Sequence, residues 1–135
     1  MQWFALKVLV ISVPSSILTQ ALKRVFERPR HETAMLEQSG LSFPSGHAMI
    51  GGSFYGLLIY IVWRTVPSPF WRWVLTILLT ILLLLIGYSR VYLNVHYATD
   101  VLAGFSAGFL WLLISIYFMR KLEIIYFRKV EKKQA

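Results

Sequence analysis

The stretch WVLTILLTILLLLIGYS, residues 73–89, decides the fold, because it contains no Asp, Glu, Lys or Arg. A helix that crosses a bilayer needs about 20 predominantly apolar residues, with a range of roughly 17–25. Working outward, segments 46–63 and 101–119 also lack these four residue types, and residues 1–22 contain only Lys7. The sequence therefore predicts an all-α fold, an integral membrane helical bundle with about four transmembrane helices.

The chain has 135 residues, enough for one domain, and we predict a single membrane-embedded domain over residues 1–135. Hydrophobic residues make up 57% of it, which exceeds the usual globular share. A soluble bundle is disfavoured, because so short a chain cannot bury several uniformly apolar helices. The transmembrane helices are expected at about 1–22, 46–64, 70–89 and 100–120, followed by a basic tail at 121–135.

The basic excess of the chain fits a membrane protein. There are 14 Lys and Arg against 6 Asp and Glu, a formal net charge of +8. No nucleic acid is expected as a partner, because the cations cluster at the ends of the predicted spans, where Lys and Arg flank helices and attract anionic lipid. Cysteine is absent, which excludes disulfides and thiolate metal sites.

The number of crossings places two polar segments on one membrane face. Residues 23–45 follow the first predicted crossing and lie on one face of the membrane. Residues 90–99 follow two further crossings and therefore lie on the same face. The opposite face carries eight cations, Arg64, Arg72, Arg120, Lys121, Arg128, Lys129, Lys132 and Lys133, against five here, Lys23, Arg24, Arg28, Arg30 and Arg90. The positive-inside rule puts the larger count in the cytoplasm. We therefore expect a cell (plasma) membrane protein whose polar segments meet on the extracytoplasmic face.

The first polar segment is rich in cations, since residues 23–31 read KRVFERPRH. A single long cation at a membrane edge usually extends its charged end to the interface while its aliphatic stem stays in the lipid. A cluster of them favours anion binding, because guanidinium groups match the oxygens of a phosphate bidentately.

The second segment is Pro44-Ser45-Gly46-His47, at the start of the second predicted helix. A helix N-terminus offers free backbone amides and a positive dipole end. Ser45 can cap the helix or donate to a phosphate oxygen, and Gly46 lets the backbone approach an anion closely. A protonated His47 in the first turn is disfavoured unless an anion compensates. The segment by itself fits either an ordinary helix start or an anion site, and His47 is the residue that points to the anion site.

The third segment, residues 89–100, reads SRVYLNVHYATD. If it is helical, His96 and Asp100 lie on one face, four residues apart. A carboxylate on one imidazole nitrogen fixes the tautomer and leaves the other nitrogen free to attack. The alternative is that Asp100 caps the following apolar helix beside an interfacial histidine.

These three segments resemble the signature of the type 2 phosphatidic acid phosphatases, integral membrane lipid phosphatases related to the vanadium haloperoxidases. The family pattern is K-x6-R-P, then P-S-G-H, then S-R-x5-H-x3-D. Residues 44–47 match its second part completely. Its third part is matched completely by Ser89, Arg90, His96 and Asp100, and its first by Lys23 and Arg30, although His31 replaces the final proline.

The resemblance implies a hydrolase that removes phosphate from a lipid phosphate ester or pyrophosphate without a metal or other cofactor. His96 would form a phosphohistidine with Asp100 orienting it, and His47 would protonate the leaving oxygen. The substrate phosphate would be held by Lys23, Arg30, Arg90, Ser45 and Gly46. Arg24 and Arg28 lie outside the pattern, so they are expected only to extend their charges to the interface. Candidate substrates are undecaprenyl pyrophosphate, phosphatidylglycerol phosphate and phosphatidate.

The family commonly has six membrane helices, and four are predicted here. The interpretation is that the missing pair would precede residue 1, so that the chain is a fragment or a reduced form. This difference bears on substrate selectivity and stability more than on the identity of the catalytic residues.

Three other functions compete with a lipid phosphatase. A zinc hydrolase would use His31, His47 and His96 with Asp100, but the neighbouring cations would repel a metal ion. A phosphotransferase of the same family would pass the phosphoryl group to a lipid or sugar acceptor. The third alternative is a non-catalytic membrane protein that binds lipid or packs against another protein. The glycine pairs Gly52/Gly56 and Gly104/Gly108 suit close helix contact, within the chain or in a homodimer.

Overall fold

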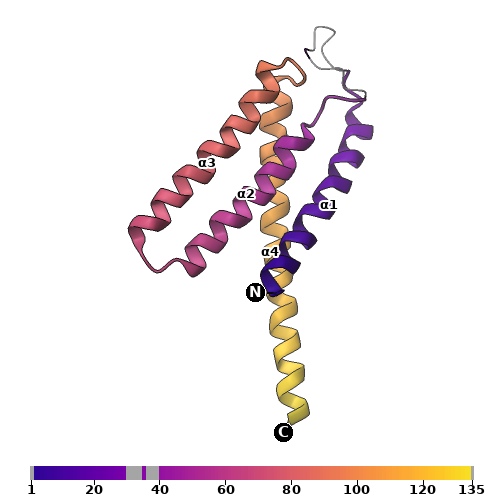
Figure 1. Cartoon of the computed structure of the whole chain (residues 1–135). Coiled ribbons are helices and arrows are strands. Elements are labelled where there is room, and N and C mark those ends of the chain that lie inside the picture. The colour runs from indigo at the N-terminus through magenta and orange to yellow at the C-terminus, as the bar shows by residue number, and fades with distance from the viewer. Residues whose placement is uncertain (1, 30–34, 36–39, 135) are drawn as a thin grey trace.

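The computed structural model of the chain describes the backbone of residues 2–29, 35 and 40–134, and their side chains except at 2–9, 12 and 126–134. The described chain is all-helical. Its elements are α1 (Gln2–Phe26), α2 (Gly46–Thr65), α3 (Pro69–Tyr92) and α4 (Ala98–Gln134), shown in Figure 1. The predicted helical fold class is confirmed.

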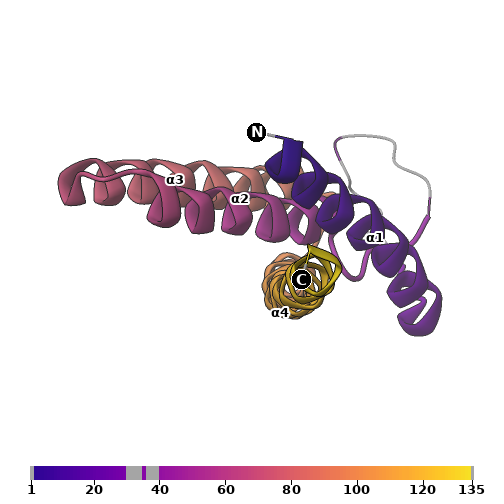
Figure 2. The ribbon, with the colours of Figure 1, turned by 90° about the horizontal axis from the view of Figure 1, so that it is seen from below.

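Helix α2 lies in the middle of the bundle and packs against each of the other three helices. It forms an antiparallel hairpin with α3, and α1 lies on its other side, as Figure 2, seen from below, shows. The α1–α2 and α3–α4 connections lie at the same end of the molecule, and the α2–α3 turn lies at the opposite end (Figure 1). The predicted meeting of the polar segments at one end therefore holds for their described residues.

Three helices are long and apolar enough to cross a membrane among the described residues: Gly46–Thr65, Pro69–Tyr92 and Ala98–Ile125. Only 11% of the α3 span is buried inside the molecule, and many of its leucines and isoleucines are exposed, although Leu83 is buried. An outward apolar face of this extent fits a lipid environment. A bilayer crossing by α1, which contains Lys7, Lys23 and Arg24, stays a prediction.

Helix α4 is longer than predicted. We expected it to end near residue 120 and to be followed by a basic tail, but the helix continues to Gln134 and has 37 residues. Its sequence from Arg120 onward lacks glycine and proline, the residues that most often end a helix. The loss of hydrophobicity near residue 120 marks the end of the apolar span, not the end of the helix.

Glycines set the close contact between α2 and α4. A Cβ on Gly104 would lie 2.7 Å from the Ser45 carbonyl oxygen, and one on Gly52 would lie 3.2 Å from the Phe105 carbonyl oxygen. A Cβ on Gly108 would meet the Met49 carbonyl oxygen. The small residues let the two backbones touch, as in other membrane helix pairs. These glycines therefore serve packing within the chain, and they bring the start of α2 against α4.

We expect Gly104→Val to destabilise the fold by about 1–3 kcal/mol, the usual cost of overpacking a close contact. The added side chain must push the start of α2 away from α4. Ser106→Val is the matched control, because Ser106 is exposed on the same helix. Thermal unfolding of the purified variants in detergent checks this. Equal melting temperatures for the two variants would contradict the glycine contact.

Candidate active site

The N-terminus of α2 carries three of the predicted site residues. Ser45 is buried and is the N-cap of α2, where its hydroxyl oxygen accepts a backbone amide three residues further on at 3.4 Å. Gly46 begins the helix against Thr19 of α1, and the exposed His47 occupies the first turn. The Ser45 amide donates to the Asp100 carbonyl oxygen at 3.0 Å. This bond joins the second polar segment directly to the third.

His96 lies in the turn between α3 and α4, before α4 begins, so the helical arrangement considered for this segment does not occur. The Arg90 carbonyl oxygen closes the turn by accepting the amides of Val95 and His96 at 3.2 and 3.3 Å. Asn94 provides the left-handed backbone of the turn, with φ 56°, a conformation that asparagine adopts more readily than most residues. The turn, and not a helix face, directs His96 toward Asp100.

The His96 and Asp100 side chains meet despite this turn. Nδ1 of His96 lies 3.5 Å from Oδ2 of Asp100, and the two side chains are 2% and 0% exposed. The same Oδ2 accepts the Tyr97 amide at 3.0 Å, the arrangement by which an acid in the first turn caps a helix. Asp100 is therefore not the N-cap residue before the helix, but it caps the helix from within the first turn, and the same carboxylate faces the histidine.

Arg28 is a member of this cluster that the sequence analysis missed. Its Nη1 atom lies 2.9 Å from Asp100 Oδ1 and donates to Thr99 Oγ1 at 2.9 Å. Its guanidinium carbon lies 4.1 Å from the centre of the Tyr97 ring. The expectation that Arg28 only extends its charge to the interface is wrong. Arg24, which had the same expectation, is exposed.

No local sequence signal points to this role of Arg28. The contact with Asp100 spans 72 positions, and the family pattern places its arginine two residues later. The packing of α1 on α2 and α4 brings the end of α1 within reach of the first turn of α4. A search for charged residues flanking the pattern would have proposed Arg24 and Arg28 equally.

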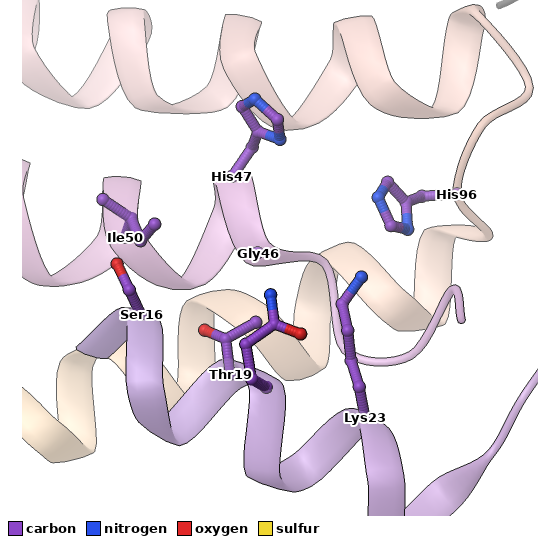
Figure 3. Close-up of a pocket in the computed structure, with 8 residues that line it drawn as sticks. Ser16, Thr19, Lys23, Gly46, His47, Ile50 and His96 are labelled. Atoms are coloured by element: carbon purple, nitrogen blue, oxygen red, sulfur yellow. The ribbon is translucent and has the colours of Figure 1, made fainter. Parts of the chain in front are cut away.

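A pocket of about 300 Å³ lies beside this cluster (Figure 3). It is lined by Ser16, Thr19, Gln20, Lys23, Gly46, His47, Ile50 and His96. Four of the predicted site residues, from three separate segments, thus share one pocket. Lys23 rises from α1 toward the two imidazoles in Figure 3, and its ammonium donates to the Leu41 carbonyl oxygen at 2.7 Å.

The remaining predicted residues are placed differently. Arg90 lies in the last turn of α3, and its Nε is buried without a hydrogen-bond partner in the described part of the chain. A buried guanidinium nitrogen of this kind has hydrogen-bonding capacity left for a ligand. Arg30 lies outside the described residues, as does His31, so the structure tests neither the predicted phosphate contact of Arg30 nor the histidine set of a zinc site.

The pocket brings together a lysine, the N-terminus of a helix and two imidazoles. Lys23 supplies a positive charge, and the first turn of α2 supplies its positive dipole end. The buried His96 has the Asp100 carboxylate 3.5 Å from its Nδ1, whereas His47 is exposed and open to proton exchange with water. Such a pair can combine nucleophilic attack with proton transfer.

Comparison with known sequences finds the same family as the three segments. The sequence model of the PAP2 superfamily matches residues 4–124. Phosphatidylglycerophosphatase B of Bacillus subtilis (strain 168) is 36% identical over 110 residues, which are 80% of this chain and 54% of that protein. Undecaprenyl-diphosphatase of Sulfolobus acidocaldarius is 33% identical over 107 residues, 78% of this chain and 46% of that protein.

A solved structure also resembles the fold. It is the crystal structure of a transmembrane PAP2-type phosphatidylglycerolphosphate phosphatase from Bacillus subtilis, with a TM-score of 0.79 and 35% sequence identity. The match covers 88% of this chain and 60% of that one. The present chain thus spans about half the length of the curated relatives it matches, so their activities are those of longer proteins.

Proposed function

The chain belongs to the PAP2 superfamily, and we propose that it is a membrane phosphatase that hydrolyses a lipid phosphate monoester or a polyprenyl pyrophosphate through a phosphohistidine. The observation that carries this proposal is the pocket shared by Lys23, His47 and His96, with Asp100 behind His96. No metal or other cofactor is part of the proposal.

In the first step, the Nε2 atom of His96 attacks phosphorus, and the bond from phosphorus to the lipid oxygen breaks. His47 gives its proton to that oxygen, which leaves as an alcohol or, for a pyrophosphate, as a monophosphate. The Asp100 carboxylate holds the other ring nitrogen and stabilises the positive charge that the imidazole acquires. The exposed position of His47 at the pocket supports its role as the acid.

In the second step, water attacks the phosphohistidine and His47 takes its proton, which releases inorganic phosphate and restores both histidines. Lys23 and Arg90 hold the non-bridging oxygens in both steps, with Arg30, Ser45 and the Gly46 amide assisting. This role is supported for Arg90 by its buried Nε, which has no partner in the described residues. Positioning and charge stabilisation of this kind supply most of what phosphoryl transfer requires of a protein.

The substrate class is inferred from the pocket and from the relatives. The pocket extends from Lys23 along α1 to Ser16, about 10 Å at 1.5 Å per residue. It therefore has room for a phosphate and the first atoms of a leaving group, while lipid tails remain against the outward apolar faces. The relatives' names provide the two test substrates, phosphatidylglycerol phosphate and undecaprenyl pyrophosphate.

We expect the purified chain to release inorganic phosphate from at least one of phosphatidylglycerol phosphate, phosphatidate and undecaprenyl pyrophosphate. Release should persist in EDTA, because lysine and arginine hold the phosphate in place of a metal. It should be blocked by vanadate, which mimics five-coordinate phosphorus. Loss of activity on chelation, with recovery on adding a divalent cation, would contradict the mechanism. Phosphate transfer that requires an added alcohol acceptor would identify a phosphotransferase instead.

The pocket is proposed to open on the extracytoplasmic side of the cell membrane, on the basis of the larger number of cations at the other end. The absence of native cysteine makes single-cysteine labelling clean. On intact cells, a membrane-impermeant thiol reagent should label Tyr92→Cys, at the pocket end, but not Ser68→Cys in the α2–α3 turn. The reverse pattern would place the pocket in the cytoplasm.

A further inference from the structure

The Asp100 carboxylate has three neighbours. His96 and Tyr97 come from the segment just before α4, whereas Arg28 comes from the end of α1. Oδ2 faces the His96 imidazole and accepts the Tyr97 amide, whereas Oδ1 is bound by Arg28. We propose that Arg28 is a positioning residue: it holds the carboxylate so that Oδ2 faces His96 and fixes the tautomer of that histidine. Its effect on rate rests on the proposed phosphatase function.

The guanidinium of Arg28 is itself fixed by several contacts. One nitrogen, Nη1, lies 2.9 Å from Asp100 Oδ1 and also bonds Thr99 Oγ1, and the planar group lies over the Tyr97 ring. A planar guanidinium uses such hydrogen-bonding and stacking contacts together, which an ammonium group does not. Arg28 therefore sets the carboxylate in one orientation in addition to balancing its charge.

The backbone around Arg28 is anchored as well. Its carbonyl oxygen accepts the Ser42 amide at 2.8 Å, and the Ser42 hydroxyl donates to the Pro29 carbonyl oxygen at 3.0 Å. Just before it, Glu27 has a left-handed backbone with φ 45° and ends α1. This turn redirects the chain from the axis of α1 toward α4. Both ends of the Arg28 side chain are thus held before any substrate binds.

Arg28 acts through Asp100 and not on the substrate. It does not line the pocket that holds Lys23 and the two imidazoles. Its side chain is 37% exposed, whereas Asp100 is fully buried. The carboxylate thus lies between Arg28 and His96, and the guanidinium stands behind it. Arg90 does not line this pocket either, but its buried Nε has no partner in the described residues, whereas the Arg28 guanidinium is bound to Asp100.

Loss of Arg28 leaves a buried carboxylate with one oxygen lacking its cation. That carboxylate can then rotate or recruit water, and its contact with Nδ1 of His96 is no longer enforced. Groups that orient a metal-bound histidine from behind typically contribute 10- to 100-fold to affinity or activity, and we take the same range for Arg28, which orients the partner of His96. We therefore expect Arg28→Gln to lower kcat roughly 10- to 100-fold and to leave KM and vanadate inhibition within about twofold of the wild type.

A double-mutant cycle tests the route through Asp100. Asp100→Asn alone should lower kcat further than Arg28→Gln does. The double variant should be no slower than Asp100→Asn, because residues that act through one another are not additive. Arg24→Gln, an exposed arginine nearby on α1, is the matched control and should keep wild-type kcat. Multiplicative losses, or a higher KM with unchanged kcat for Arg28→Gln, would overturn the proposal and make Arg28 a substrate contact.

A second measurement does not depend on activity. The chain has three histidines, so nitrogen NMR of histidine-labelled protein in detergent can follow His96, with His96→Gln used for assignment. We expect the Nδ1–H tautomer in the wild type and in Arg24→Gln, and a mixture of tautomers in Arg28→Gln. Arg28→Lys, which keeps the charge, covers the case in which the glutamine variant fails to fold, and it should show an intermediate mixture.

The outcomes separate the two proposals. A wild-type protein that hydrolyses none of the lipids removes the proposed function, while the NMR comparison still decides the role of Arg28. A wild-type His96 tautomer in a folded Arg28→Gln or Arg28→Lys protein overturns that role, even if the phosphatase activity is established.

Discussion

His96→Ala is expected to abolish phosphate release from every substrate, on the order of 10⁶-fold, the loss seen when a covalent nucleophile is removed. His47→Ala should be selective instead. A lipid alkoxide is a poor leaving group that needs the proton of His47, whereas a nitrophenolate does not. Hydrolysis of lipid phosphate should therefore fall roughly 10²- to 10⁴-fold, while p-nitrophenyl phosphate still reacts with His96 in the first step.

The second step provides the measurement for this pair. His47→Ala also lacks the base that activates water, so a reaction quenched under alkaline conditions should contain acid-labile phosphate on His96. His31→Ala is a matched histidine control, for which no loss is expected. Phosphate trapped on His47 would reverse the two assignments. If no variant traps phosphate, direct attack by water becomes the better mechanism.

Arg90→Ala is expected to lower kcat/KM roughly 10²- to 10³-fold, the usual cost of removing one preorganised donor from a developing negative charge. The buried Nε of Arg90 has no partner in the described residues, so its hydrogen-bonding capacity is left for substrate oxygens. Vanadate should inhibit this variant much less strongly, because vanadate presents the same equatorial oxygens. Vanadate inhibition therefore distinguishes the role of Arg90 from that of Arg28, because loss of Arg28 is expected to leave this inhibition nearly unchanged.

Arg24→Ala is the control for Arg90 as well, since Arg24 is exposed at the end of α1. Arg90→Lys should recover part of the activity, because an ammonium keeps the charge but not the planar fork. Equal losses for Arg24→Ala and Arg90→Ala would mean that the cations act as a diffuse positive surface and not as a defined phosphate clamp.

The helices were predictable because an apolar run long enough to cross a bilayer leaves few structural alternatives. The start of α2 was predicted at its observed residue, since Ser45 and Gly46 supply both a cap and a helix start. The end of α4 was not, because helicity after residue 120 no longer follows hydrophobicity. A span boundary is set by the bilayer, whereas a helix end is set by caps and breakers.

The site was predictable in part of its membership and not in its geometry. Lys23, Gly46, His47 and His96 share a pocket, as the motifs implied. The His96–Asp100 contact was expected from a helix face and is made instead by a turn at Asn94. Spacing in sequence limited the distance between the two side chains, but it did not select the backbone conformation that brings them together.

The sequence by itself determined the fold class, the number of helices and the end of the bundle at which the polar segments meet. The fold class and the helices follow from the local composition of each segment. The shared end of the polar segments follows from the number of helices between them. The tertiary structure alone decided that Arg28 binds Asp100, across 72 positions. That contact depends on the packing of α1 against α2 and α4, while glycines such as Gly104 let α2 and α4 lie close together. Helix packing thus decides which cation becomes the partner of Asp100. In the sequence alone, the several cations at a membrane edge cannot be told apart.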